Sequence, residues 1–85
     1  MKYTNITADT LIKTGPGKVY GVVVNSHTSG TLKLWDNTSA ATTVITNTYT
    51  FTAGSQVVTF PDAIAFNTGL YADIGGTVDL TIIWK

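Results

Sequence analysis

The sequence contains no cysteine and only one histidine, His27. A disulfide within the chain is therefore excluded, and any one copy lacks the Cys and His ligands that are typical of a structural zinc site. The only zinc site of this kind left open would gather one His27 from each subunit around a symmetry axis. We expect no metal and no cofactor.

Charge is also scarce. Charged residues make up 12% of the chain, against about 25% in ordinary soluble domains. The cations are all lysines, the carboxylates are all aspartates, and the formal net charge is zero. Binding to a phosphate backbone depends on clustered positive charge, so we expect no nucleic-acid partner. A surface with so few ions is easily desolvated when proteins meet.

No long hydrophobic run occurs near the start of the sequence. MKYTNITADTL has one lysine followed by mostly polar residues, whereas a secretory signal needs an apolar stretch of about 7 to 15 residues. A membrane-spanning helix needs about 20 apolar residues in succession. We expect neither a signal peptide nor a membrane partner.

The chain is short for a self-sufficient core. Its 85 residues and 9.0 kDa correspond to one domain, and such a domain buries roughly 60 to 65% of its unfolded surface. Small domains usually compensate with disulfides, a metal or association. Because the first two are missing, we expect a homo-oligomer.

What the sequence does contain is β-branched and aromatic residues together with threonine, which favour strands. No helical periodicity is sustained. The pattern predicts strands at 8–14, 18–26, 31–36, 44–52, 55–60, 69–74 and 77–84, with a loop at 37–43. Turn signals separate them: Gly15-Pro16-Gly17, His27 to Gly30, Ala53-Gly54, Pro61-Asp62 and Gly75-Gly76. This spacing indicates one all-β domain over residues 1–85, a compact antiparallel β-sandwich or jelly roll.

The two central strands suggest which faces are buried. Val78, Leu80, Ile82 and Trp84 alternate on one face of the last strand, as in a sheet with one side on a core. The strand at 18–26 is apolar on both faces, so one face is expected to meet another sheet and the other another subunit. We expect 19–24, 32–34 and 78–84 to supply the main inward faces, and assign Tyr20, Val22 and Val24 to the oligomer interface.

No catalytic motif is complete. Gly15-Pro16-Gly17-Lys18 lacks the first glycine and the hydroxyl residue of a phosphate-binding loop. No nucleophile elbow surrounds the serines beside His27. The aspartates fall in predicted turns or at outward positions, where a solvated carboxylate is ordinary. We expect no catalytic residues, and a small hydrolase that uses Asp and His27 is the least favoured alternative.

The stretch GTLKLWDNTSA, residues 30–40, has two interpretations. Trp35, Asp36 and Asn37, with Tyr71, have the chemistry of a ligand or partner surface. Alternatively, Asp36 and Asn37 end a strand and hydrogen-bond the backbone of a turn, which is the interpretation we favour. A carbohydrate-binding module that stacks sugars on Trp35, Tyr20 or Tyr71 is the leading alternative function.

Several segments resemble small bacteriophage virion proteins. They are residues 11–17, the valine-rich strand that reaches Asn25, residues 30–37, 66–70 and 76–82. The resemblance is to head decoration or cement proteins and related head or neck components. It implies a β-rich, non-enzymatic structural protein, usually trimeric, that contacts its own copies and the major capsid or another virion protein. It also implies synthesis in the host cytoplasm and residence in the virion, and a lectin-like module would suit a virion surface or tail.

Overall fold

The computed structural model describes residues 1–52 and 54–85, and within them all regular structure is β-strand. The all-β prediction is confirmed. The strands are β1 (Lys2–Ile6), β2 (Thr10–Thr14), β3 (Gly17–Trp35), β4 (Val44–Thr50), β5 (Gln56–Phe66) and β6 (Gly69–Trp84). The predicted turn at Ala53-Gly54 falls partly outside the described residues, because Ala53 is not among them.

All six strands belong to one antiparallel sheet rather than to two separate sheets. The long strands β3 and β6 pair with each other from Val19↔Trp84 to Trp35↔Tyr71. Strands β1 and β2 pair with opposite ends of β6, and β5 and β4 pair with opposite ends of β3. The sheet therefore has a central pair with two short strands on each side, and neither the sandwich of separate sheets nor the jelly roll is confirmed.

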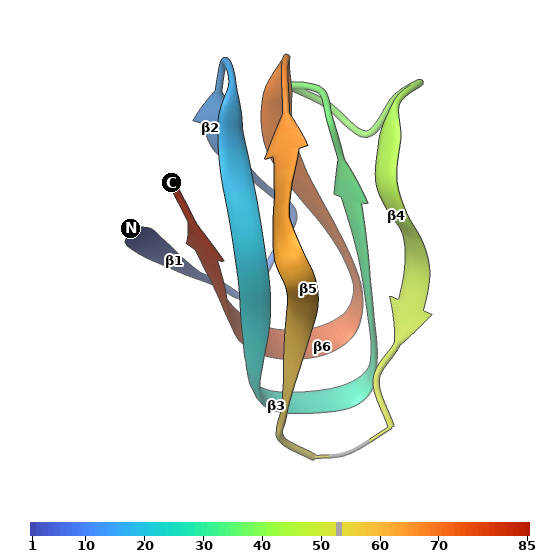
Figure 1. The fold of residues 1–85 in the computed structure, drawn as a ribbon. Coiled ribbons are helices and arrows are strands. Elements are labelled where there is room, and N and C mark those ends of the chain that lie inside the picture. The colour runs from blue at the N-terminus through green and yellow to red at the C-terminus, as the bar shows by residue number, and fades with distance from the viewer. Residues whose placement is uncertain (53) are drawn as a thin grey trace.

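Strands β3 and β6 turn together at one corner, so that the sheet folds back on itself (Figure 1). The register shifts there, with Thr28 opposite Thr77 but Thr31 opposite Gly75. Ser29 and Gly76 have φ angles of 51° and 76°, which belong to the left-handed region where a strand changes direction. The predicted hairpin at 27–30 and the predicted break at Gly75-Gly76 were wrong, because both segments bend without ending their strands.

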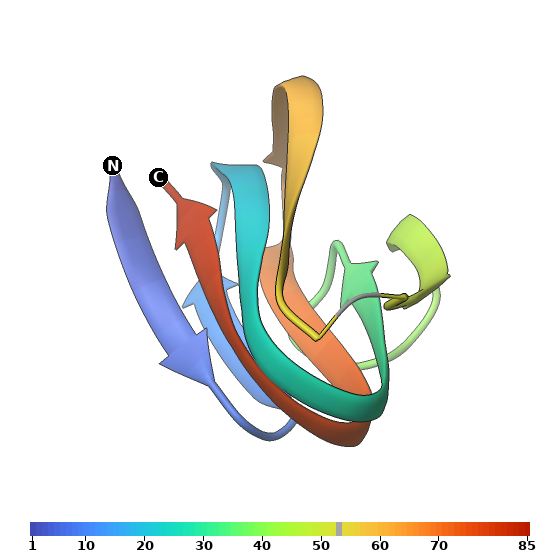
Figure 2. The same ribbon diagram turned by 90° about the horizontal axis from the view of Figure 1, so that it is seen from below.

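Two other boundaries differ from the expectation. Residues 2–6 form β1, which the sequence pattern did not predict. Pro61-Asp62 does not end a strand, because β5 continues through it: Val19 pairs with Ile64 but Gly21 pairs with Thr59, so the intervening β5 residues bulge outward. A proline is tolerated in such a bulge on an edge strand, where its missing N–H breaks no ladder bond. In the view from below, this part of β5 projects from the molecule (Figure 2).

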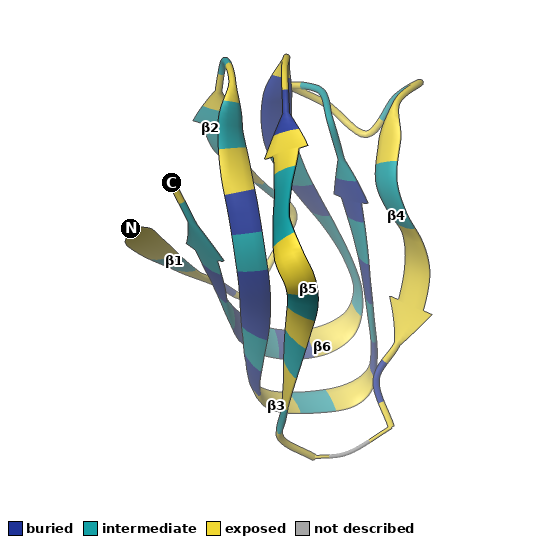
Figure 3. Ribbon diagram, in the orientation of Figure 1, coloured by how far each residue is buried: buried dark blue, intermediate teal, exposed yellow. Residues whose placement is uncertain are grey.

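The core lies between the two arms of the folded sheet and comes mainly from β3 and β6 (Figure 3). Its buried side chains are Ile6, Val19, Val22, Val24, Leu32, Leu34, Phe51, Phe66, Leu70, Ala72, Val78, Leu80 and Ile82. Trp84 is half-buried and packs against them. The inward faces predicted within 19–24, 32–34 and 78–84 are therefore confirmed.

The predicted oligomer interface was wrong at two of its three residues. Val22 and Val24 are each 1% exposed and belong to the core of a single chain. The cause is a bulge between Val19 and Gly21, which shifts the alternation by one, so that Val19 and Val22 both face inward. Tyr20 is half-buried at this bulge, and its part in an interface stays a prediction.

Candidate functional site

Asp36 directly follows β3 and caps the turn between β5 and β6. Its Oδ1 accepts the backbone N–H groups of Thr68 at 2.8 Å and Asn67 at 3.0 Å, and more weakly that of Gly69 at 3.4 Å. Turn N–H groups have no ladder partner, so a carboxylate is a suitable acceptor. The carboxylate thus serves the fold, joining the end of β3 to a turn far away in the sequence.

The same contacts determine the charge state of Asp36. Partial desolvation by itself would raise the pKa of its carboxyl group, but the N–H donors of Thr68, Asn67 and Gly69 outweigh it, and the pKa lies below its ordinary value. Hydrogen bonds to the charged form favour that form. Asp36 is therefore ionised at neutral pH and is not set up as a general acid.

Asn37 holds the loop that follows β3. Its side-chain amide donates to the carbonyl oxygen of Ala41 at 2.9 Å and to Oγ1 of Thr42 at 3.2 Å, and its Oδ1 accepts the N–H of Thr38. Asp36 and Asn37 both bond backbone groups of turns, in agreement with the turn interpretation of GTLKLWDNTSA. Both side chains are thus already engaged with backbone groups of the fold.

Trp35 and Tyr71, both predicted as surface residues, are direct partners across β3 and β6. Leu11 on β2 pairs with Tyr71, and Val44 on β4 pairs with Trp35. Directly opposed residues share a face of a sheet, so the four side chains form a row, here called the outer row, on the face opposite Leu34 and Ala72. Leu11 and Val44 were missed because only the strand register reveals them. Tyr20 lies in the other half of β3, away from this row.

The outer row is not an open stacking platform. The ammonium group of Lys33 lies 4.4 Å from the centroid of the Trp35 ring, a favourable cation–π distance. Trp35 is half-buried, and its indole N–H has no hydrogen-bond partner among the described residues. A sugar could stack on Trp35 only after displacing Lys33.

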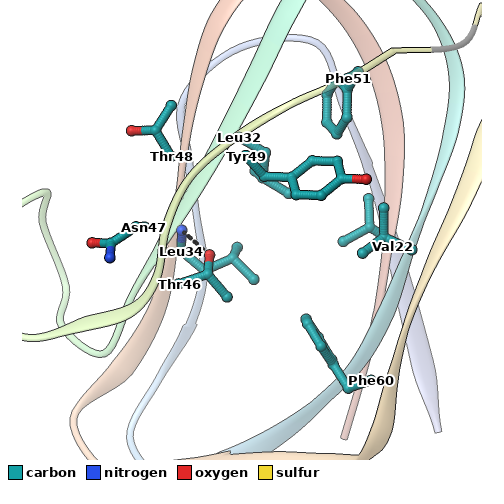
Figure 4. A pocket seen from close by; sticks show the side chains of 10 residues that line it. Val22, Leu32, Leu34, Thr46, Asn47, Thr48, Tyr49, Phe51 and Phe60 are labelled. Carbon is teal, nitrogen blue, oxygen red and sulfur yellow. Dashed lines mark hydrogen bonds between the residues drawn. The ribbon is translucent and has the colours of Figure 1, made fainter.

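The open side of the molecule lies between β4 and β5, which do not pair with each other in the described part of the chain. An apolar pocket of about 120 Å³ opens there onto the core (Figure 4). Val22, Leu32 and Leu34 form its floor. Its walls come from β4, from the residue after β4 and from β5: Thr46, Asn47, Thr48, Tyr49, Phe51, Val58 and Phe60. We call this feature the β4–β5 opening.

A side-chain link spans one end of the β4–β5 opening. Gln56 Nε2 donates to the hydroxyl oxygen of Tyr49 at 3.2 Å, and Gln56 Oε1 accepts the N–H of Thr52. The Tyr49 ring also lies 5.6 Å from the ring of Phe51. Tyr49 nevertheless remains 43% exposed, so the opening retains an aromatic rim that water contacts. No sequence signal marked it, because β4 and β5 meet only through the fold of β3.

The remaining candidate groups are engaged in the fold. His27 Nδ1 accepts the N–H of Gly30 at 3.1 Å at the corner of β3, and its ring lies 5.4 Å from that of Phe51. Asp79 accepts the amides of Asn5 at 2.8 Å and Asn25 at 3.1 Å; these two bonds lower the pKa of its carboxyl group. Within residues 1–52 and 54–85, no group of three or more acidic or histidine side chains is placed to hold a metal ion.

Comparison with known proteins adds no relative. No protein-family model, no curated protein and no solved structure matches the chain. Among the residues that the structure describes, no helix is long and apolar enough to cross a membrane.

Proposed function

We propose that this protein is a non-enzymatic structural component of a phage virion, of the capsid decoration or cement type. The observation that carries the proposal is the β4–β5 opening: an apolar pocket continuous with the core, left uncovered between two strands that do not pair with each other in the described part of the chain. Removing the apolar floor residues and the partly exposed Tyr49 ring from water is favourable in free energy. A partner protein supplies that shielding.

The surface chemistry supports the same proposal. The net charge is zero and charged residues are few, so that association desolvates few ions. The carboxylates of Asp36 and Asp79 are already hydrogen-bonded within the chain. Partners of this kind are other copies of the chain and the major capsid protein or another virion protein, and the working location is the virion after synthesis in the host cytoplasm.

Co-expression tests the proposal. The chain is produced together with the proteins encoded beside its gene, and the assembled particles are sedimented and analysed by mass spectrometry. We expect the chain to sediment with shells of the major capsid protein and to raise their melting temperature. A chain that stays in the supernatant with every neighbouring assembly would refute the virion role.

A carbohydrate-binding module is the second candidate, because the outer row places Trp35, Tyr71, Leu11 and Val44 together on one face. Its test is a glycan array with the wild type, Trp35→Ala and Lys33→Ala. A sugar-stacking site loses binding in Trp35→Ala and gains it in Lys33→Ala, since the latter uncovers the indole ring. Binding that is equal in all three proteins, or absent from all, excludes this candidate.

A further inference from the structure

We infer that two copies of this chain pair through the free edges of β4, antiparallel across a twofold axis, and thereby cover the β4–β5 opening. The inference rests on the proposed function, since it names one partner for the surface that carries it. This twofold contact differs from the threefold contact of a trimer, which the family resemblance implies.

Four strands of the sheet have a free edge. Among the described residues β1, β2, β4 and β5 each pair with one strand only, so each has one unpaired edge. Proteins protect such edges with lysine, proline or bulges, because bare edges recruit other strands. Lys2 lies on β1, Lys13 and a register shift lie on β2, and Pro61-Asp62 lies in the bulge of β5.

The edge of β4 lacks the chemical part of this protection. Val44–Thr50 reads VITNTYT, seven residues with no charged side chain and no proline. The strand does bulge against β3, with shifts between Leu32 and Leu34 and between Leu34 and Trp35, so it bends with the sheet. Of the four edge strands, β4 is the one whose entire length carries neither a charged side chain nor a proline.

The uncharged edge of β4 suits a second copy of the same chain. A twofold axis brings each side chain near its own counterpart, so a charged edge would repel a second copy. An uncharged edge removes that obstacle. With the axis at Asn47, antiparallel pairing sets Ile45 opposite the partner subunit's Tyr49. Both side chains lie on the core side of the sheet, since Ile45 packs against the core and Tyr49 pairs with the buried Leu32. An aliphatic–aromatic pair is favourable in an antiparallel sheet.

The pocket lies beside the free edge of β4. Residues Thr46 to Tyr49 line it consecutively, so the edge of β4 is also the rim of the β4–β5 opening (Figure 4). Tyr49 pairs with the buried Leu32 and therefore faces the core side of the sheet. A second β4 added at this edge brings the partner subunit's Ile45 and Tyr49 onto the same side. The two openings then shield each other's apolar rims.

Light scattering on the purified chain over a range of micromolar concentrations provides the first test. The expected mass is that of two chains. A mass of one chain throughout overturns the inference, and a mass of three chains overturns the twofold contact in favour of the threefold one. A monomer that still sediments with capsid shells refutes only this inference, whereas a dimer that binds no virion protein refutes only the proposed function.

Two lysine substitutions, one at the proposed axis and one elsewhere, test where the subunits meet. Asn47→Lys places a lysine at the axis, next to its own counterpart, and should weaken dimerisation by about tenfold or more. Tyr3→Lys is the matched control, since it adds the same charge at an exposed position on the edge strand β1, which borders β6 and not the opening, and should leave the dimer mass unchanged. Equal dissociation constants for the two variants overturn the assignment to β4.

Hydrogen exchange on the wild type keeps the inference testable if Asn47→Lys does not fold. Dimerisation through β4 should slow the exchange of outward N–H groups within Val44–Thr50 as concentration rises, while those on the free edge of β1, which borders β6, stay fast. A dimer whose β4 exchange rates do not depend on concentration pairs through another surface, which contradicts the inference.

Discussion

Asp36 and Thr68 are joined by a hydrogen bond of 2.8 Å from the backbone N–H to the carboxylate, although 32 positions separate them in the sequence. The bond fastens the end of β3 to the turn between β5 and β6. Trp35, the residue before Asp36, lies opposite Tyr71 on β6. The Asp36 carboxylate thus holds the turn beside one end of the outer row.

Replacing this carboxylate should destabilise the fold. Asp36→Asn keeps the size of the side chain but removes the negative charge that attracts the three N–H donors. We expect a loss of about 1 to 2 kcal/mol in the free energy of unfolding, measured by urea denaturation. Asp62→Asn is the control, because the Asp62 carboxylate bonds only the neighbouring Ala63 N–H in the described contacts and is exposed. Equal effects in both variants would contradict a capping role for Asp36.

The depressed pKa of Asp36 predicts how stability depends on pH. When the pKa of an Asp is lower in the folded than in the unfolded state, the unfolded state binds more protons, so a fall in pH destabilises the fold. Its contribution is complete above the ordinary Asp pKa of about 4 and is lost as the pH falls through the folded value. Asp79, whose pKa the amides of Asn5 and Asn25 also lower, acts with the same sign.

Unfolding free energies measured from about pH 7 down to about pH 2 should therefore fall below about pH 4. Asp36→Asn should make the curve flatter in that range, and Asp36→Asn combined with Asp79→Asn flatter still. An unchanged slope in the double variant would mean that neither carboxylate is stabilised by folding.

The backbone geometry at the corner of β3 and β6 can be tested by replacing Gly76, with Gly15 and Gly54 elsewhere in the chain as comparisons. A Cβ added to Gly76 would lie 2.4 Å from the carbonyl oxygen of Ser29, and the φ of Gly76 is +76°. Gly15 has a φ of +91° but open space around it, and Gly54 has open space without a positive φ. Thermal unfolding of the three Ala variants should therefore give a graded series.

We expect Gly76→Ala to lose about 2 kcal/mol or more, Gly15→Ala about 1 kcal/mol, and Gly54→Ala less than about 0.5 kcal/mol. The first combines steric overlap with backbone strain and the second has strain alone. If Gly76→Ala were as stable as Gly54→Ala, the close approach of the β3 and β6 corners would not be a requirement of the fold.

The sequence predicts the parts of this fold that depend on local alternation. Val78, Leu80 and Ile82 repeat every second residue, and the structure buries all three. The bend at Ser29 and Gly76 was not predictable in the same way, because Ser and Gly signal a hairpin turn as readily as a bulge. Whether a hairpin turn or a bulge forms depends on whether Thr28 pairs with Thr77, which lies on a strand far away in the sequence.

The candidate site shows the same division. Trp35 and Tyr71 can be picked out individually as aromatic residues near strand ends, but their pairing depends on the register of β3 with β6. The β4–β5 opening has no local signature, since it is defined by which strands remain unpaired. The Asp36 cap likewise depends on a contact with Thr68 that no spacing in the sequence indicates.

The bulge between Val19 and Gly21 leads to the last prediction, which concerns the strand once expected to carry the oligomer contact. Val22 is 1% exposed, so Val22→Lys buries an ammonium group among apolar side chains. An unpaired buried charge is penalised by more than most small domains can tolerate. We expect Val22→Lys to be unfolded by circular dichroism, rather than to be a folded monomer.

Val57→Lys is the matched control on the neighbouring strand. Val57 is 64% exposed and pairs with Val23 on the outer face, so its lysine reaches water without disturbing the core. We expect the wild-type spectrum and a melting temperature within a few degrees of the wild type. A folded Val22→Lys protein with a lower mass than the wild type in light scattering would instead place Val22 at a subunit contact. The bulge between Val19 and Gly21 would then not turn Val22 into the core.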